Sequence, residues 1–290
     1  MTKNKLAIIG GSGLYDVEEF KEREFLKINT PWGQPSDEIL KIKYKGKEVC
    51  FLPRHGKGHF ISPTNINFRA NIDALKRAGV TDIISLSSVG SFKKNLFPGK
   101  FVLVDQFIDR TFARVKSFFG KGCVAHVSMA EPVSKQLGKI ILSACRKSKI
   151  SIQSGGTYLA IEGPQFSTLA ESLLYKNWGC SVIGMTNMPE AKLAREAEIC
   201  YATVAMVTDY DCWHPDHAHV EVADIIRVLT DNADRARTLV QVAAPYLASR
   251  PEICPHGCDR ALETALITQP EARDLAMAQK LDAVAGRVLG

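Results

Sequence analysis

The stretch Leu6-Ala-Ile-Ile-Gly-Gly-Ser-Gly13 places a short apolar run directly before a glycine-rich turn. An apolar run bounded by glycine is typical of a strand that is buried on both faces. Glycine lets the backbone approach an anion closely, and the Ser12 hydroxyl would add a donor. The spacing is neither a dinucleotide-binding motif, because Asp16 replaces the third glycine, nor a Walker loop. The stretch therefore predicts a buried strand that ends at an anion site or at a plain glycine turn.

Strand and helix patterns alternate along the rest of the chain. Strands are predicted at 39–44, 49–52, 82–86, 101–104, 158–161, 181–185 and 201–208, and helices at 68–78, 135–147, 169–179, 189–198 and 220–247. The remainder is rich in alanine and is expected to be helical. This alternation predicts an α/β fold with a central, mostly buried sheet. Ligands of such sheets bind beyond the carboxyl ends of the strands, so the polar residues there are the candidates for function.

The composition of the 290 residues is that of an ordinary globular protein, with 46% hydrophobic and 23% charged residues. It excludes disordered, collagen-like and fibrous chains. No apolar run reaches the roughly 20 residues of a membrane helix, and the run after Lys5 is too short for a signal peptide. We therefore expect a cytoplasmic protein without a membrane partner, whose eight cysteines are mostly reduced, buried thiols.

The net charge of +6 is unevenly distributed along the chain. Residues 1–150 hold 26 basic and 13 acidic residues, whereas residues 151–290 hold 11 and 18. A basic half suits nucleic acid or a phosphorylated ligand. A solvated, lysine-rich surface is the simpler explanation, and the chain has no motif that combines basic and aromatic residues for stacking on bases. We therefore expect no nucleic-acid partner.

Two segments that follow strands carry groups suited to an anion. In Pro53-Arg-His-Gly-Lys-Gly-His59, Arg54 offers a planar fork for phosphate, and His55 and His59 could donate to the same anion or to a sugar hydroxyl. The segment Ser85-Leu-Ser-Ser-Val-Gly-Ser91 is a hydroxyl-rich strand end that could donate to phosphate oxygens. The alternatives are a basic surface loop and a turn satisfied by its own side chains.

Two later segments carry carboxylates and a ring. Glu162 could accept from sugar hydroxyls or hold a cation, and Phe166 could stack on a flat ring or simply pack in the core. Asp209 and Asp211 follow an apolar strand and share one face if the chain stays extended. A carboxylate pair in a partly dry site can have one raised pKa, which creates a general acid near neutral pH. The alternative is a solvated acidic loop.

Together these segments resemble the 5′-methylthioadenosine phosphorylases of the trimeric purine nucleoside phosphorylase family, from residue 8 to about residue 239. The matching motifs are Ile9-Gly-Gly-Ser-Gly-Leu14, Thr30-Pro-Trp-Gly-Gln-Pro-Ser36, Arg54-His-Gly, Asp105-Gln-Phe-Ile-Asp-Arg-Thr111, Met129-Ala-Glu-Pro132, Ile161-Glu-Gly-Pro-Gln-Phe-Ser167, Met185-Thr186 and Thr208-Asp-Tyr-Asp-Cys-Trp213. Each motif is weak alone, but their order and spacing are specific.

The resemblance implies a single α/β domain with a central, mixed, twisted and partly barrel-like sheet flanked by helices. It implies phosphorolysis of 5′-methylthioadenosine, in which inorganic phosphate is the co-substrate and no cofactor takes part. The implied phosphate site is Ser12, Arg54, His55, Ser87, Ser88 and Thr186. The implied nucleoside site is Met185 under the ribose, Phe166, Ser167 and Thr208 near the purine, Asp209 as the acid at purine N7, and Asp211 as the acceptor for the 6-amino group.

The resemblance also bears on substrate and assembly. An acceptor carboxylate favours adenine over a 6-oxo purine. Val222 and Ile225 match a methylthio pocket with His59 beside it, and His126 resembles a histidine supplied by an adjacent subunit of a homotrimer. Serine stands at positions 12 and 87, where the family usually has threonine, and at position 88, where it has alanine. The expected organisation is a phosphorylase domain at 1–245 and a helical tail at 246–290, packed on the same domain or on a neighbouring subunit.

Other functions remain open at this point. Cys212, His214, His217 and His219 suggest zinc, with Cys254, His256 and Cys258 as a second lobe, but their spacing is irregular and we expect no metal. Cys254 and Cys258 could instead pair in a disulfide, which a cytosol disfavours. A nicotinamide-dependent oxidoreductase is disfavoured by the broken glycine pattern. Within the family, phosphorylases of adenosine, inosine, guanosine or methylthioinosine are the alternatives.

Overall fold

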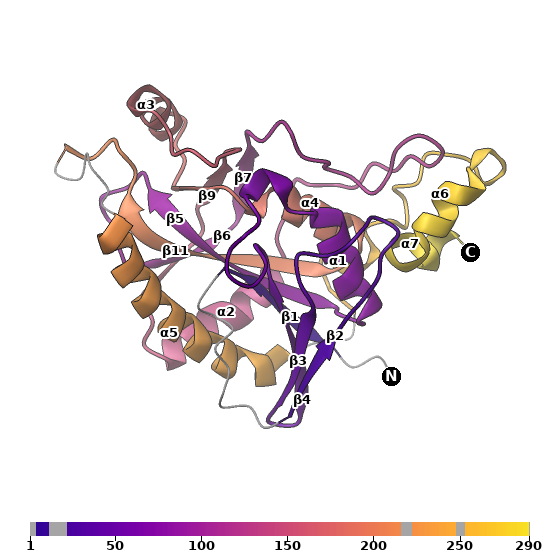
Figure 1. Ribbon diagram of the computed structural model, residues 1–290, viewed down its shortest axis with the longest axis horizontal. Coiled ribbons are helices and arrows are strands. Elements are labelled where there is room, and N and C mark those ends of the chain that lie inside the picture. The colour runs from indigo at the N-terminus through magenta and orange to yellow at the C-terminus, as the bar shows by residue number, and fades with distance from the viewer. Residues whose placement is uncertain (1–3, 12–21, 216–221, 248–252, 290) are drawn as a thin grey trace.

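The computed structural model describes residues 4–11, 22–215, 222–247 and 253–289, apart from the side chains of 222–226. It is an α/β fold in which helices cover both faces of one sheet (Figure 1). The strands are β1 Leu6–Gly10, β2 Arg23–Leu26, β3 Ile39–Tyr44, β4 Lys47–Pro53, β5 Asp82–Ser91, β6 Phe101–Val104, β7 Gln106–Asp109, β8 Ile152–Ser154, β9 Thr157–Ala160, β10 Val182–Gly184 and β11 Cys200–Tyr210.

The sheet is mixed and branches at its longest pair of strands. Its main order is β2-β3-β4-β1-β5-β10-β9-β7, and β11 pairs with β5 on one side and with β6 on the other, after which β8 follows. One edge of β5 pairs first with β1, parallel, and then through Gly90 and Ser91 with β10, antiparallel. The other edge pairs with β11, parallel. Among the described residues the sheet does not close on itself.

The helices form two layers (Figure 1). α2 and α5 pack together on one face of the sheet, while α1, α4 and α7 lie on the other. The helices are α1 Phe68–Arg77, α2 Lys135–Lys147, α3 Leu169–Asn177, α4 Asn187–Glu196, α5 Val222–Leu247, α6 Leu275–Lys280 and α7 Asp282–Leu289, with 3₁₀ turns η1 Pro63–Asn65, η3 Cys258–Arg260 and η4 Pro270–Ala272.

Each face of the sheet carries its own hydrophobic core, as β1 illustrates. Ala7 and Ile9 belong to the cluster under α1 and α4, whereas Leu6 and Ile8 belong to the cluster under α2 and α5. Successive side chains of a strand point to opposite faces, so a strand covered on both sides must be apolar throughout. This explains why the sequence around residues 6–9 identifies a central strand.

Local chemistry sets the helix boundaries that the sequence predicts. Thr168 and Glu171 form a capping box at the start of α3, next to the predicted boundary at residue 169. Gly79 follows α1 with a φ of +78°, the left-handed conformation common after a helix. α4 begins at Asn187, but Met188 departs from helical geometry, so the regular part starts at Pro189 as predicted.

The strands differ from the prediction in two ways. β5 continues to Ser91, because β11 and β10 pair with its second half. Ser87 and Ser88 therefore lie within the strand rather than after it. The short strands β2, β7 and β8 were missed, since each has three or four residues and is held by its neighbours in the sheet.

In the described part of the tail, residues 253–289, the α-helices are confined to its end, in α6 and α7, and the 3₁₀ turns η3 and η4 precede them. Leu262, Ala265 and Leu281 are buried in the core cluster that contains α1 residues. The predicted division at residue 245 falls near the end of α5, which runs from Val222 to Leu247. The division into a domain and a tail therefore stays a prediction.

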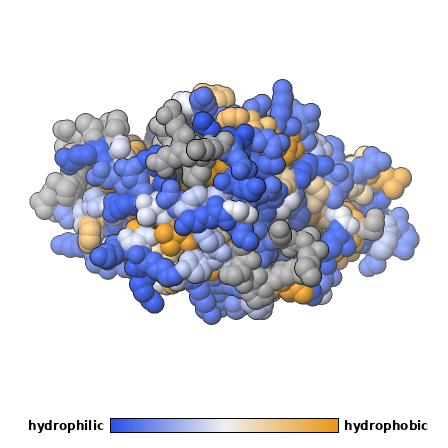
Figure 2. Space-filling model, turned by 90° about the horizontal axis from the view of Figure 1, so that it is seen from below, coloured by the Kyte–Doolittle hydropathy of each residue, from blue (hydrophilic) through white to orange (hydrophobic). Residues whose placement is uncertain are grey.

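The surface seen in Figure 2 is mostly hydrophilic, with apolar groups scattered among polar ones. Within the described segments, no helix is both long enough and apolar enough to cross a bilayer. All eight cysteines are free thiols, and seven of them are buried.

Candidate active site

One cavity of about 320 Å³ gathers most of the predicted site residues. It lies where β1, β4, β5 and β11 end or approach their ends, as expected for an open α/β sheet. Twelve of the sixteen predicted residues line it: Arg54, His55, His59, Ser87, Ser88, Phe166, Ser167, Met185, Thr186, Thr208, Asp209 and Asp211. The cavity therefore brings together residues that are far apart in the sequence, such as Arg54 and Thr186.

The remaining four predicted residues are not placed in the cavity. Ser12 lies outside the described residues, although Gly11 before it lines the cavity. Val222 and Ile225 begin α5, but their side chains lie outside the described part of the chain. His126 is exposed, and its N–H donates to the carbonyl of Ala265 in the tail. The role expected for His126 in a neighbouring subunit's site stays a prediction.

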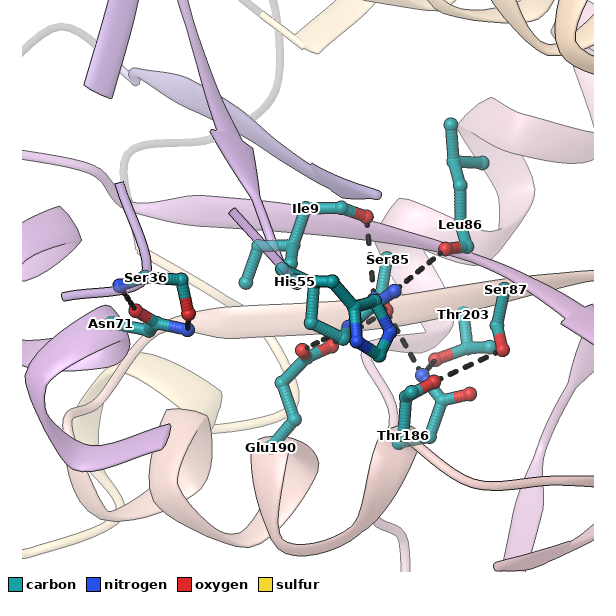
Figure 3. Close-up of polar contacts among 12 residues, drawn as sticks. Ile9, Ser36, His55, Asn71, Ser85, Leu86, Ser87, Thr186, Glu190 and Thr203 are labelled. Carbon is teal, nitrogen blue, oxygen red and sulfur yellow. Dashed lines mark hydrogen bonds and ion pairs between the residues drawn. The ribbon is translucent and has the colours of Figure 1, made fainter. Parts of the chain in front are cut away.

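Arg54, His55, Ser87 and Thr186 line the part of the cavity that we call the anion end. A buried carboxylate, Glu190, holds Arg54 there. Arg54 Nε donates to Oε2 of Glu190 at 2.8 Å, its Nη2 donates to Ser85 Oγ at 2.7 Å, and its Nη1 donates to the Leu86 carbonyl at 3.1 Å. In Figure 3 dashed lines run to the labelled Glu190 and Leu86, which accept two of these bonds. The guanidinium is therefore fixed in direction, and part of its charge is balanced before any anion binds.

A second layer of hydrogen bonds fixes Glu190. Its Oε1 accepts from Ser85 Oγ at 2.6 Å and from Tyr201 Oη at 2.9 Å. Asn187 donates to Ser85, Tyr201 and Thr203. The network joins β5, α4 and β11, so the start of α4 is tied to the sheet at the site.

Hydroxyl groups from β5 and from the start of α4 meet at this end of the cavity. Ser87 Oγ lies 3.1 Å from Thr186 Oγ1 and 3.1 Å from Tyr158 Oη. Thr186 is the N-cap residue of α4, and its side chain makes no capping hydrogen bond. Its hydroxyl is thus left to interact with Ser87, and Thr186 lines the cavity. Ser88 is exposed and also lines the cavity.

His55 is neutral at pH 7 in this site. Burial and the charge of Arg54 lower the pKa of His55 to about 4. Its Nδ1 lies 2.8 Å from the Ile61 carbonyl, so Nδ1 carries the proton and Nε2 has a free lone pair. The ring stacks on His59 with centroids 4.1 Å apart. His55 can therefore accept a hydrogen bond from a protonated phosphate or a sugar hydroxyl.

Two carboxylates stand at the end of β11: Asp209 is half-buried and Asp211 is buried. The register of β11 shifts between Val207 and Asp209, and Asp209 then pairs with Gly90 of β5. Burial and the nearby Asp211 raise the pKa of Asp209 to about 6, against the opposing hydrogen bond from Thr208. Asp209 is therefore poised to hold or release a proton near neutral pH.

One carboxylate oxygen of Asp211 is available to accept a hydrogen bond from a ligand. Burial raises the pKa of Asp211, against a smaller opposing effect of the nearby Ser172 hydroxyl. Its Oδ2 atom is buried and has no hydrogen-bond partner among the described residues, and the same is true of Ser167 Oγ. Both residues line the cavity. Buried polar atoms are normally satisfied, so this pair marks a place for the polar edge of a ligand.

Met185 is positioned by an arginine that the sequence analysis did not single out. Arg114 Nη1 donates to the carbonyls of Met185 and Met188, at 2.6 and 2.7 Å. Its Nε donates to Glu162 Oε1 at 2.9 Å, so Glu162 holds a cation, one of its two predicted roles. Burial opposes ionisation of Glu162, but hydrogen bonds from Thr64 and from the main chain lower its pKa to about 2.

Phe166 lines the cavity although 73% of it is exposed. Core packing is thus excluded for this ring within the described chain, and stacking on a ligand stays possible. Thr208 Oγ1 donates to Asp209 Oδ2 at 2.6 Å and so orients this acid, while its predicted place near the purine stays a prediction. Apolar Leu229 and Ala233 of α5 complete the wall.

Sequence reasoning missed four residues that shape the site: Arg114, Glu190, Leu229 and Gly184. Leu229 lies four residues after Ile225, on the same face of a helix, so helical spacing could have identified it. Gly184 lines the cavity, and a Cβ there would stand 2.0 Å from Tyr158 Oη. No local pattern in the sequence marks Arg114 and Glu190, because the residues they contact are distant in the sequence.

Comparisons with known proteins agree with this geometry. The phosphorylase superfamily model matches residues 5–244. The S-methyl-5′-thioadenosine phosphorylase of Bradyrhizobium diazoefficiens is 63% identical over 289 residues, which cover 100% of this chain and 99% of that protein. The one from Cereibacter sphaeroides is 60% identical over 287 residues, which cover 99% of each.

Solved structures are similar throughout the fold. A methylthioadenosine phosphorylase from an Antarctic soil metagenome superposes with a TM-score of 0.92 at 45% identity, covering 98% of this chain and 99% of that one. The Schistosoma mansoni methylthioadenosine phosphorylase in complex with adenine gives 0.82 at 35% identity, covering 86% and 93%. The chain belongs to the phosphorylase superfamily and, within it, to the family of S-methyl-5′-thioadenosine phosphorylases.

Proposed function

We propose that the chain catalyses phosphorolysis of 5′-methylthioadenosine to adenine and 5-methylthioribose 1-phosphate. One observation carries the proposal: one cavity joins a cluster of hydroxyls, Arg54 and His55 to the carboxylates of Asp209 and Asp211, and the buried Oδ2 of Asp211 has no partner among the described residues. Such a cavity accommodates phosphate at one end and the edge of a base at the other. The relatives named above support the substrate.

At the anion end, the proposed role of the protein is to place phosphate against the anomeric carbon of the sugar. Ser87 and Thr186 offer hydroxyl donors, and Arg54 offers a fixed positive charge. Neutral His55 accepts from the protonated oxygen of the phosphate monoanion. Orientation of the nucleophile accounts for a large part of such catalysis, because there is little covalent work for the protein to do.

At the base end, the proposed general acid is Asp209. As the glycosidic bond breaks, negative charge grows on the purine, and a protonated Asp209 neutralises it at N7. Its pKa of about 6 leaves a usable fraction protonated near neutral pH. Asp211 Oδ2 accepts from the 6-amino group, which satisfies an atom that has no partner among the described residues.

The proposed reaction takes inorganic phosphate as co-substrate and needs no cofactor, because side chains and main-chain groups supply every role. Leu229 and Ala233 give the cavity an apolar wall on α5, the helix that Val222 and Ile225 begin. Apolar walls favour a methylthio group over a hydroxyl by about the transfer free energy of one or two methylenes.

We further propose a homotrimer with a site completed by a neighbouring subunit. Phe112 and Phe166 are 82% and 73% exposed, and Leu169 and Trp178 of the α3 region are also exposed. Exposed aromatic side chains next to a cavity leave apolar area in contact with water, which is unfavourable unless another chain covers it. Light scattering should give three times the mass of 31.9 kDa. We also place the enzyme in the cytoplasm, where its free thiols stay reduced.

The decisive experiment is release of free base from 5′-methylthioadenosine, adenosine and inosine, each with and without phosphate. The proposal requires adenine release that depends on phosphate and is fastest with the methylthio substrate. Release that is fastest from inosine would mean that Asp211 has been misassigned. Release without phosphate would show hydrolysis instead.

A further inference from the structure

Three cysteines from two distant parts of the chain meet in the interior, away from the active-site lining. Cys200 is the first residue of β11, whereas Cys254 and Cys258 flank a turn in the tail. Their Sγ atoms all lie within 4.8 Å of one another. The three residues are 1–3% exposed and form a cluster of their own. A single buried cysteine needs no explanation, but three that converge on one point do.

Main-chain and side-chain hydrogen bonds hold the turn that carries Cys254 and Cys258. Gly257 has a φ of +67°, and its N–H donates to the Cys254 carbonyl at 3.0 Å. The Cys254 N–H donates to Asp259 Oδ2 at 2.7 Å. The turn thereby holds the Cys254 and Cys258 sulfurs together, within 4.8 Å of each other and of the Cys200 sulfur.

The spacing of the sulfurs suits coordination of one ion. Ligands at the usual zinc–sulfur distance of about 2.3 Å in a tetrahedral site are separated by about 3.8 Å, which is within the limit observed here. A disulfide would bring two sulfurs to about 2 Å and leave the third without a role. Three thiolates are a soft ligand set, which selects Zn²⁺ or Cu⁺ over hard cations.

The surrounding charges favour a divalent ion. Arg195 acts electrostatically on Cys258, and Lys76 acts on Cys200. Asp82 is the opposing charge beside Cys200. Asp259 adds a second carboxylate beside the cluster, since its Oδ2 accepts from the Cys254 N–H. A divalent ion therefore leaves less uncompensated negative charge in the interior than Cu⁺ does, which favours Zn²⁺.

We infer that Cys200, Cys254 and Cys258 bind one Zn²⁺ ion, which fastens the tail to the start of β11. This replaces the expectation of no metal. The sequence pointed to Cys254 and Cys258 only as a second lobe beside the residues around 212–219, and it did not include Cys200. His217 and His219 of that first lobe lie outside the described residues. The site lies apart from the residues proposed for phosphorolysis, so its failure would leave that proposal intact.

Metal content is the direct test. The full chain, incubated with Zn²⁺ and dialysed against metal-free buffer, should retain one zinc per chain. Cys200→Ser and Cys258→Ser should each lower zinc affinity by more than about 100-fold, since even indirect partners of a metal cost up to that much. Cys50→Ser and Cys145→Ser, equally buried but outside the cluster, should bind zinc as the unchanged chain does.

Two measurements on the unchanged chain keep the test independent of variant folding. X-ray absorption at the zinc edge should show three sulfurs at about 2.3 Å. With Co²⁺ in place of Zn²⁺, a thiolate-to-metal charge-transfer band should appear. Loss of zinc on dialysis, zinc ligated only by nitrogen and oxygen, or an intact mass two hydrogens lower would each overturn the inference. Retention of Cu⁺ with no retention of Zn²⁺ would overturn the choice of metal.

Discussion

Arg54 Nε lies 2.8 Å from Oε2 of Glu190, and each of these side chains is only 2% exposed. The pair connects the loop after β4 to α4, two segments 136 residues apart in the sequence. Because the carboxylate is itself held by Ser85 and Tyr201, the guanidinium has one direction. The anion end of the cavity is thus formed by a rigid charge rather than by a surface arginine.

Glu190→Gln should destabilise the protein strongly, because it leaves the buried Arg54 charge uncompensated. We expect a loss of about 3–5 kcal/mol in the free energy of unfolding, measured by urea denaturation. Glu131→Gln breaks an exposed pair with Lys135 and should cost less than about 1 kcal/mol. Equal losses in the two variants would show that the buried network contributes no more than the surface pair.

Asp209→Asn should remove the proposed acid with little change in shape. We expect kcat/KM for adenosine to fall by about 10²–10⁴-fold at pH 6. In the unchanged enzyme kcat/KM should decline as pH rises above about 6, since the acid is then ionised, and the variant should lose this limb. Asp234→Asn, an exposed acid on α5, is the control. A variant that keeps the same pH profile would remove Asp209 from the mechanism.

The raised pKa of Asp209 also predicts how stability depends on pH. The folded state holds the proton up to about pH 6, whereas the ordinary value is 3.8, so ionisation costs stability as pH rises between these values. The contribution amounts to about 2–3 kcal/mol between pH 4 and pH 8. Unfolding of Asp209→Asn should lack this loss. If both proteins lose the same free energy over this range, the pKa of the Asp209 carboxyl is not raised in the folded state.

Asp211→Asn should change which base is accepted. Asparagine offers an N–H donor in place of the unpartnered Oδ2, so a 6-oxo purine gains a partner and adenine loses one. The ratio of kcat/KM for adenosine to that for inosine should fall by about 10²-fold or more. Tyr210→Phe is the matched control. It removes a polar group next to Asp211 in the sequence, but that hydroxyl donates to the Lys94 carbonyl and Tyr210 is not among the residues that line the cavity. An unchanged ratio would place the 6-position of the base elsewhere.

Gly184→Ala should disrupt the wall of the cavity, because a Cβ would meet Tyr158 Oη at 2.0 Å and Cζ at 2.7 Å. Overpacking of this kind costs about 1–3 kcal/mol in the free energy of unfolding. The displaced Tyr158 hydroxyl would also leave Ser87, so KM for phosphate should rise. Gly286→Ala meets nothing within 4 Å and should leave both quantities near those of the unchanged chain.

Much of the site was predictable because polar residues follow or end apolar strands. Arg54, Thr208, Asp209 and Asp211 are each marked by such a position, and all line the cavity. Glu190 gave no such signal, since its neighbours in the sequence read as an ordinary helix. Only the packing of α4 against β5 brings it to Arg54.

The sequence by itself determined which residues carry charge, hydroxyl or thiol, and which strands must be buried on both faces. Short-range pattern is enough for that, because burial and hydrogen bonding along a strand or helix repeat with fixed periods. Only the tertiary structure decided which distant groups meet: Arg54 with Glu190, Arg114 with Met185, and Cys200 with Cys254 and Cys258. Such contacts depend on the register of β11 against β5 and on how the tail packs, which arise from the whole core rather than from any local run of residues.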